Sequence, residues 1–111
     1  MFEQTPNEEV LFIIKEIESN PSTTQRTISY NLDISLGKTN YLLKELIKKG
    51  FIEVKNFSSN PGKFRKLNYI LTKTGFEHKI QLMQHFLKIK ENEYNMLKQD
   101  FEQLTTKGLN I

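Results

Sequence analysis

The feature that most constrains this chain is a series of apolar residues, spaced alternately by four and three positions, along its C-terminal third. The series is Phe76, Ile80, Met83, Leu87, Lys90, Tyr94, Leu97, Phe101 and Leu104, in which Lys90 is the charged exception. This spacing aligns the side chains along one side of an α-helix and is typical of a coiled-coil seam. We therefore expect one long helix from about Thr72, a suitable N-cap, to about Thr106.

A lone amphipathic helix of about 30 residues extends roughly 45 Å, more than the core of a 111-residue chain can cover. Another helix must cover the seam, most simply that of a second copy. A second apolar stripe with Leu82, Phe86 and Ile89 suits Leu11 and Phe12 of the first predicted helix. The alternative is a tail that only folds back onto its own chain, and we expect both contacts together. The residues assigned to dimerisation are Leu11, Phe12, Phe76, Ile80, Met83, Leu87, Tyr94, Leu97, Phe101 and Leu104.

The N-terminal part predicts two helices before its first tight turn. Residues 5–8 (TPNE) are typical of a helix start, and Asn-Pro at residues 20–21 ends that helix. Thr23 or Thr24 is a suitable cap for a second, short helix. Asp33 follows where the turn requires a left-handed backbone, which Asp adopts at some cost.

The next segment predicts a third helix and a β-hairpin. Ser35 is a good N-cap for this helix and Gly50 a good terminator. Residue types over 51–57 and 64–71 predict two strands joined by the turn SSNPGK. Three helices followed by two strands are the order of a winged helix-turn-helix. We predict a mainly α (α+β) winged-helix fold with a two-stranded wing, in which residues 1–71 form the helix-turn-helix domain and residues 72–111 the long C-terminal dimerisation helix.

The third helix opens with two residues that are unfavourable for an isolated helix. Gly37 costs roughly 1 kcal/mol relative to Ala, and Lys38 places a cation where the helix dipole favours an anion. Both suit a helix end that docks on DNA, since Gly37 permits close backbone approach and Lys38 can meet phosphate or guanine. The alternative is a solvated helix face with an incidental glycine. The other residues of the face opposite the apolar one are Asn40, Tyr41, Lys44 and Lys48.

Further residues extend this predicted interface. Asn40 can pair bidentately with adenine, and Tyr41 can meet phosphate or a thymine methyl. Gln25 and Arg26 could meet the phosphates that flank the groove. A wing over about 58–66 would present Lys63, Arg65 and Lys66 to the DNA backbone or minor groove. The alternative there is a hairpin whose basic residues protect an edge strand.

Other chemistry finds little support in the residues. Gly37-Lys38-Thr39 resembles the end of a phosphate-binding loop, but Leu32 stands where that motif needs its first Gly. His78 and His85 lie seven positions apart without further metal-ligating residues, and the chain has no cysteine. We expect no catalytic residues, no metal and no cofactor, and therefore no enzyme. The N-terminus is not a signal peptide and no segment suits a membrane span, so we expect a cytoplasmic protein without a membrane partner.

The chain resembles MarR-type winged-helix regulators, specifically the short bacterial branch associated with exopolysaccharide synthesis. The resemblance runs through STTQRTISYNLDISLGKTNYLLKELIKKGFI, LNYILTKTG and HFLKIKENEYNMLKQDFEQL, over roughly residues 8–105. It implies a dimeric DNA-binding transcription factor, and we expect it to act on exopolysaccharide genes. The two-fold symmetry of the expected dimer predicts a palindromic operator. Full-size MarR proteins often bind small phenolic ligands, but this chain lacks their extra dimerisation helices, so we expect no small-molecule effector. With the recognition residues that the resemblance implies, the predicted DNA-binding set is Gln25, Arg26, Ser35, Leu36, Gly37, Lys38, Asn40, Tyr41, Lys44, Lys63, Arg65 and Lys66.

Two other classes of function compete with a DNA-binding regulator whose recognition helix spans about 35–49. One is a protein-interaction adaptor, because winged helices also serve as assembly modules and the tail could pair with a foreign helix. The basic face argues against it, since an adaptor would present an apolar or mixed-sign surface. RNA binding is weaker, because the hairpin lacks a paired aromatic platform for stacking bases. The net charge of +3 permits an anionic partner without requiring one.

Overall fold

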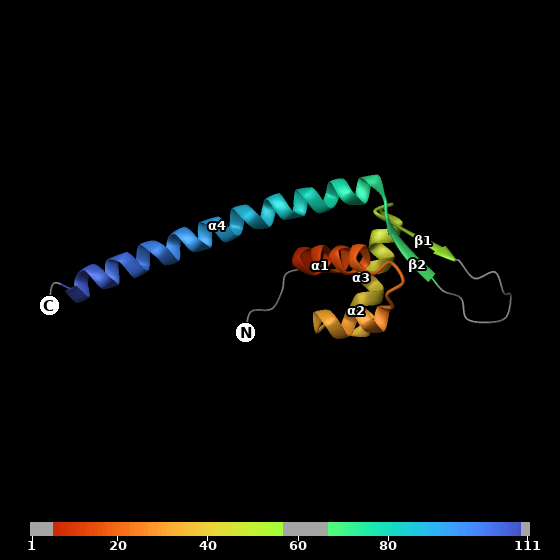
Figure 1. Cartoon of the computed structure of the whole chain (residues 1–111), viewed down its shortest axis with the longest axis horizontal. Coiled ribbons are helices and arrows are strands. Elements are labelled where there is room, and N and C mark those ends of the chain that lie inside the picture. The colour runs from red at the N-terminus through yellow and green to blue at the C-terminus, as the bar shows by residue number, and fades with distance from the viewer. Residues whose placement is uncertain (1–5, 57–66, 110–111) are drawn as a thin grey trace.

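The computed structural model describes residues 6–56 and 67–109 of the chain. Three helices, an antiparallel pair of strands and one long helix follow one another in the predicted order, so the mainly α winged-helix fold is confirmed (Figure 1). The elements are α1 (Pro6–Ser19), α2 (Gln25–Leu32), α3 (Leu36–Lys48), β1 (Ile52–Asn56), β2 (Leu67–Leu71) and α4 (Lys73–Leu109).

Local capping sets the turn between α2 and α3. The side chain of Thr24 accepts a hydrogen bond from the backbone N–H of Thr27 at 3.1 Å, which starts α2. Asp33 has a left-handed backbone with φ 54°, as the turn requires. The hydroxyl of Ser35 accepts a hydrogen bond from the backbone N–H of Lys38 at 3.0 Å and starts α3. The side chains of Thr24 and Ser35 thus satisfy N–H groups that a helix start leaves unpaired.

Two further signals place the ends of the remaining helices. Gly50 directly follows the C-cap of α3. Its φ of 77° is a backbone conformation that residues with a side chain rarely adopt. The hydroxyl of Thr72 accepts a hydrogen bond from the backbone N–H of Gly75 at 3.0 Å, which caps α4 as expected. The helix continues to Leu109, beyond the predicted end near Thr106.

The core of the N-terminal part gathers side chains from α1, α2, α3 and both strands. Strands β1 and β2 pair antiparallel, with Ile52 opposite Leu71. The apolar faces of the three short helices enclose the inner side of this pair. The buried residues of this cluster are Ile13, Ile17, Ile28, Leu42, Leu43, Leu46, Ile52 and Tyr69.

A second, smaller core joins α1 to the first part of α4. Leu11, Ile14 and Leu82 are buried together, with Phe86 packed against them. An ion pair between Lys79 of α4 and Glu18 of α1 strengthens the contact. Leu11 is buried against Leu82 of the same chain, and its assignment to the dimer interface stays a prediction. The fold-back contact through the second stripe is confirmed, while Phe12 is only half-buried.

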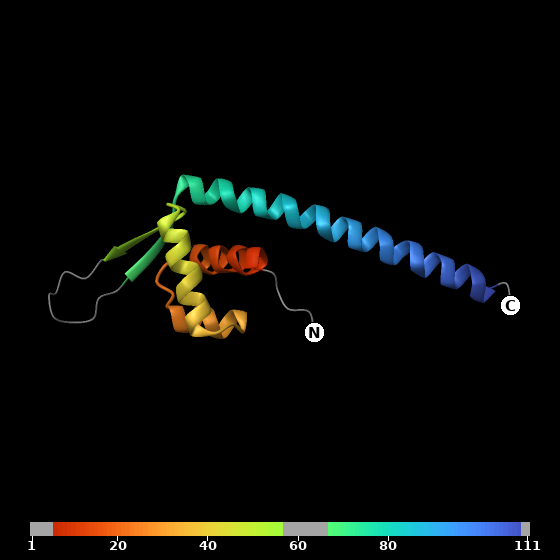
Figure 2. The ribbon, with the colours of Figure 1, turned by 180° about the vertical axis from the view of Figure 1, so that it is seen from behind.

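The rest of α4 projects away from the domain. Figures 1 and 2 show α1 beneath the first half of α4, whereas the C-terminal half continues past the N-terminal domain. The molecule measures 76 × 26 × 20 Å, so this helix gives it its length. Every residue from 90 to 108 is exposed.

Candidate nucleic-acid interface

The outer face of α3 is exposed while its inner face anchors the helix in the core. Leu42, Leu43 and Leu46 are buried on the inner side. Tyr41 and Lys44 are exposed on the other side, as the 3.6-residue period predicted. The core thus fixes the helix and leaves its polar face accessible to a ligand.

Gly37 lies in open space at the start of this exposed face. A Cβ atom added there would meet no heavy atom within 4 Å. No packing among the described residues therefore requires glycine at this position. The absence of a side chain leaves the first turn of α3 flat, which suits close approach of another molecule's backbone.

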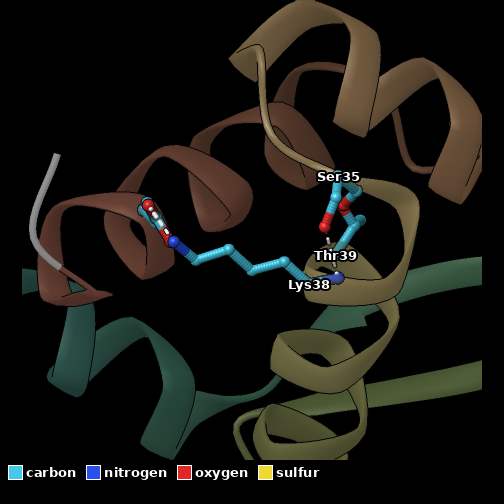
Figure 3. A network of polar contacts seen from close by, with 4 residues as sticks. Ser35, Lys38 and Thr39 are labelled. Atoms are coloured by element: carbon cyan, nitrogen blue, oxygen red, sulfur yellow. Dashed lines mark hydrogen bonds and ion pairs between the residues drawn. The ribbon is translucent and has the colours of Figure 1, made fainter. Parts of the chain in front are cut away.

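The first turn of α3 is held rigidly from within. The hydroxyl of Thr39 is fully buried and donates a hydrogen bond to the carbonyl oxygen of Ser35 at 2.9 Å. The side chain of Ser35 accepts from the backbone N–H of Lys38 in turn (Figure 3). Ser35 therefore has a capping role in the free protein, in addition to the predicted role at the DNA interface.

The side chain of Lys38 points to α1. Its Nζ atom lies 2.7 Å from Oε1 of Glu9, and Figure 3 shows the side chain extended from α3 across to that helix. In the free protein this ion pair engages Lys38, and its predicted place at the edge of the DNA face stays a prediction. The physical reason for the ion pair is that the Glu9 side chain is only 4% exposed, and a buried carboxylate requires a cation. The sequence held one sign of this, because Glu9 stands one helical turn before the buried Ile13.

Asn40 and Gln25 meet between α2 and α3. The Nε2 atom of Gln25 donates a hydrogen bond to Oδ1 of Asn40 at 3.2 Å, and both residues are half-buried. Gln25 was expected to meet phosphate, which stays a prediction; in the free protein its amide contacts Asn40 of α3. The structure thus brings two predicted interface residues into direct contact.

The exposed side of α2 carries Tyr30, which was not among the predicted interface residues. Arg26 is exposed, as expected of a phosphate ligand. Tyr30, one helical turn further along α2, is 86% exposed and presents its hydroxyl on the same side of the helix. Phenol hydroxyls donate hydrogen bonds to phosphate. The spacing of four residues between Arg26 and Tyr30 already indicated in the sequence that both lie on the same side of the helix.

Other predicted interface residues are split between described and undescribed parts of the chain. Leu36 is 43% exposed at the start of α3. Lys63, Arg65 and Lys66 of the predicted wing tip lie outside the described residues. The strands that lead to that tip are present, and Lys55 is exposed on β1.

The predicted seam lies open along α4. Its apolar side chains are between 41% and 70% exposed, and Leu97 and Leu104 lie near the upper limit. The ammonium of Lys90 lies 3.9 Å from a carboxylate oxygen of Glu93, in a pair too exposed to stabilise the helix appreciably. The apolar members are Phe76, Ile80, Met83, Leu87, Tyr94, Leu97, Phe101 and Leu104.

The start of α4 is fixed to the end of α3. The hydroxyl of Thr72 donates a hydrogen bond to the carbonyl oxygen of Gly50 at 2.6 Å. A Cβ atom at Gly75 would come within 2.1 Å of the carbonyl oxygen of Phe51, so only glycine fits there. These contacts fix the start of α4 against the segment that directly follows α3.

Two observations bear on other chemistry. Among the described residues, no group of three or more His, Cys, Asp or Glu side chains is placed to hold a metal ion. No helix in that part of the chain is both long and apolar enough to cross a membrane.

His78 stacks on Phe51 with ring centroids 4.4 Å apart. Its pKa is lowered, mainly by burial and to a smaller extent by the charge of Lys49.

Comparison with known proteins agrees with this arrangement. Residues 12–53 match a family model described as winged helix-turn-helix DNA-binding. This match covers α2 and α3 together with most of α1 and the start of β1. No curated protein matches the chain significantly.

Solved structures of DNA-binding proteins share the fold. Sso10a-2, a DNA-binding protein from Sulfolobus solfataricus, is 24% identical with a TM-score of 0.65, over 91% of this chain and 97% of that one. A MarR family transcription regulator is 16% identical with a TM-score of 0.57, over 94% of this chain and 73% of the other. A MepR variant from S. aureus, solved with a bound oligodeoxyribonucleotide, is 16% identical with a TM-score of 0.58, over 93% of this chain and 78% of that one. The chain therefore has the winged helix-turn-helix fold of MarR-type regulators, with a long C-terminal helix.

Proposed function

We propose that this chain is a DNA-binding transcription regulator that acts as a homodimer. The observation that carries the proposal is the exposed face of α3, where Gly37, Tyr41 and Lys44 are accessible while the opposite face of the helix is buried in the core. A helix in this position of a winged helix-turn-helix enters the major groove. The match of residues 12–53 to a DNA-binding family model supports the same role.

Each side chain of the proposed DNA interface, on α3, α2 and the wing, has a role that follows from its chemistry. Lys44 and Arg26 neutralise phosphates, and this contact supplies affinity without sequence information. Tyr41 meets phosphate or a thymine methyl. Asn40 is the base reader, since a carboxamide pairs bidentately with adenine. The wing residues Lys63 and Arg65 extend the contact to the DNA backbone or minor groove.

The exposed seam of α4 supports the homodimer. Exposure of eight apolar side chains along one side of a helix to water is unfavourable, and burying them against a partner removes this cost. At about 25 cal/mol per Å², even partial burial of these side chains favours association by several kcal/mol. A second copy offers a seam of the same length and spacing. Two-fold symmetry then sets two recognition helices against a palindromic site with half-sites about one DNA turn apart.

The most specific part of the proposal is the identity of the regulated genes. The resemblance of this sequence to the exopolysaccharide-associated branch supports exopolysaccharide genes as targets. A polysaccharide assay on cells that lack the chain tests this part separately.

Selection of duplexes from a random pool by the purified protein tests the proposed function. We expect one enriched palindrome, whose affinity falls linearly with the logarithm of salt concentration. An adaptor with a coiled-coil tail would enrich no sequence and bind all duplexes weakly, which would refute the proposal.

A further inference from the structure

The hydrogen bond between Gln25 and Asn40 links the two helices of the helix-turn-helix at the proposed base-reading position. Gln25 is the first residue of α2, and Asn40 lies in the second turn of α3. The donor is Nε2 of Gln25 and the acceptor is Oδ1 of Asn40, at 3.2 Å. Both side chains are half-buried, so the bond is partly shielded from water.

The backbones that carry this bond are both fixed. Thr24, directly before Gln25, caps α2 by accepting the N–H of Thr27. Thr39, directly before Asn40, is fully buried and bonded to the carbonyl of Ser35. The two amides therefore meet through anchored backbones, and only their side-chain torsions remain to be set.

We propose that Gln25 is a positioning residue that determines sequence specificity by orienting the side-chain amide of Asn40 toward a base edge. The proposal rests on the proposed function, because it requires that α3 reads DNA. It differs from a phosphate contact by Gln25, which would add affinity on every sequence alike.

The chemistry of the amide supports this role. The torsion that turns an Asn amide has broad, roughly two-fold preferences, so an isolated Asn40 would present its oxygen and its NH₂ group in either order. A donor from Gln25 fixes Oδ1 on the side of α2. That bond uses one lone pair of the oxygen and leaves a second lone pair and both N–H donors free. One acceptor and one donor side by side are what bidentate recognition of adenine requires.

Gln25→Met is the variant that isolates the hydrogen bond. Methionine has a similar length and helix propensity, so it preserves packing at the start of α2 while removing the donor. Gln25→Ala removes both the donor and the packing. If orientation is the role of Gln25, the two variants lose discrimination equally, and restoring the packing with Met rescues nothing.

The measurement is discrimination, defined as the ratio of affinities for the selected palindrome and for duplexes altered at one base pair. It is made on the intact chain, on Gln25→Met, on Asn40→Ala and on the double variant. We expect Gln25→Met to lower discrimination at one base pair per half-site by a factor of about three to ten, which lies in the lower part of the range for coupled side chains in contact. In the Asn40→Ala background, Gln25→Met should have no further effect.

The possible outcomes separate this inference from the proposed function. If the intact chain selects no sequence, the proposed function itself fails. If it selects one and Gln25→Met keeps full discrimination, the orienting role is refuted. Equal weakening on all duplexes, additive with Asn40→Ala, would show that Gln25 contacts DNA directly and would also refute it. Thermal unfolding of each variant confirms that the compared proteins are folded.

Discussion

The ammonium of Lys38 on α3 lies 2.7 Å from the carboxylate of Glu9 on α1. The Glu9 side chain is 4% exposed and that of Lys38 is 44% exposed, so the pair is buried at its acidic end only. The second carboxylate oxygen, Oε2, is buried with no hydrogen-bond partner among the described residues. Lys38 thus compensates a buried charge and ties the start of α3 to α1.

This asymmetry predicts unequal effects of removing either partner. Lys38→Met leaves the Glu9 carboxylate buried without a cation and should lower the free energy of unfolding by roughly 1–3 kcal/mol. Glu9→Gln leaves an ammonium that water can reach, so its cost should be smaller. Urea denaturation of both variants measures the difference. A larger loss in Glu9→Gln would contradict the assigned geometry.

Lys44 is the described cation that most directly tests phosphate contact by α3. Lys44→Ala should weaken binding to all duplexes and reduce the salt slope by about one unit. Lys38→Met should leave that slope unchanged, because its ammonium is engaged by Glu9. Lys15→Ala on α1 removes the same charge and is the control. An unchanged slope in Lys44→Ala would place the docking face elsewhere.

Two glycines should respond in opposite ways to the same substitution. At Gly37 a methyl group meets nothing within 4 Å, so Gly37→Ala should stabilise the free protein, by up to about 1 kcal/mol. If α3 docks through its first turn, the methyl collides with DNA. Affinity should then fall by about tenfold, within the usual range for overpacking. Calorimetry with DNA titration measures both effects, and unchanged affinity would refute docking through that turn.

At Gly75 the added methyl would lie 2.1 Å from the carbonyl oxygen of Phe51. Gly75→Ala should therefore destabilise the protein by about 1–3 kcal/mol, because the start of α4 must shift. The contrast with Gly37→Ala controls for the intrinsic helix preference of alanine. Equal stabilisation by both substitutions would contradict the tight contact between the start of α4 and Phe51.

His78 predicts how stability changes with pH. Burial against Phe51 and the charge of Lys49 lower its pKa from 6.5, so the folded protein takes up a proton less readily than the unfolded chain. The stability associated with His78 is therefore complete above pH 6.5 and is lost as the pH falls through the lowered pKa. His78→Gln should remove this loss of stability as the pH falls below 6.5, and urea denaturation at a series of pH values measures it. Identical profiles for His78→Gln and the intact chain would contradict the assignment.

The sequence predicted those parts of the fold that depend on neighbouring residues. The caps Thr24, Ser35 and Thr72 and the left-handed Asp33 act within a few positions, so residue type alone identified them. The seam of α4 was equally readable, because its period requires only helical geometry.

The contacts that depend on tertiary packing were not predictable in this way. The ion pair of Lys38 joins residues 29 positions apart, and no local rule connects them. The same holds for the bond between Gln25 and Asn40, and for the close approach of Gly75 to Phe51. Leu11 was identified as apolar, but only the path of α4 shows that Leu82 covers it.

Sedimentation equilibrium of the intact chain at micromolar concentration tests the dimer on which the proposed function rests. Leu97→Asp with Phe101→Asp places two charges in the seam, and Asn92→Asp with Gln99→Asp places them on the opposite face as a control. We predict twice the chain mass of 13.1 kDa for the intact protein and the control, and the single chain mass for the seam variant. A monomeric intact protein, or a seam variant that dimerises as well as its parent, would contradict the account.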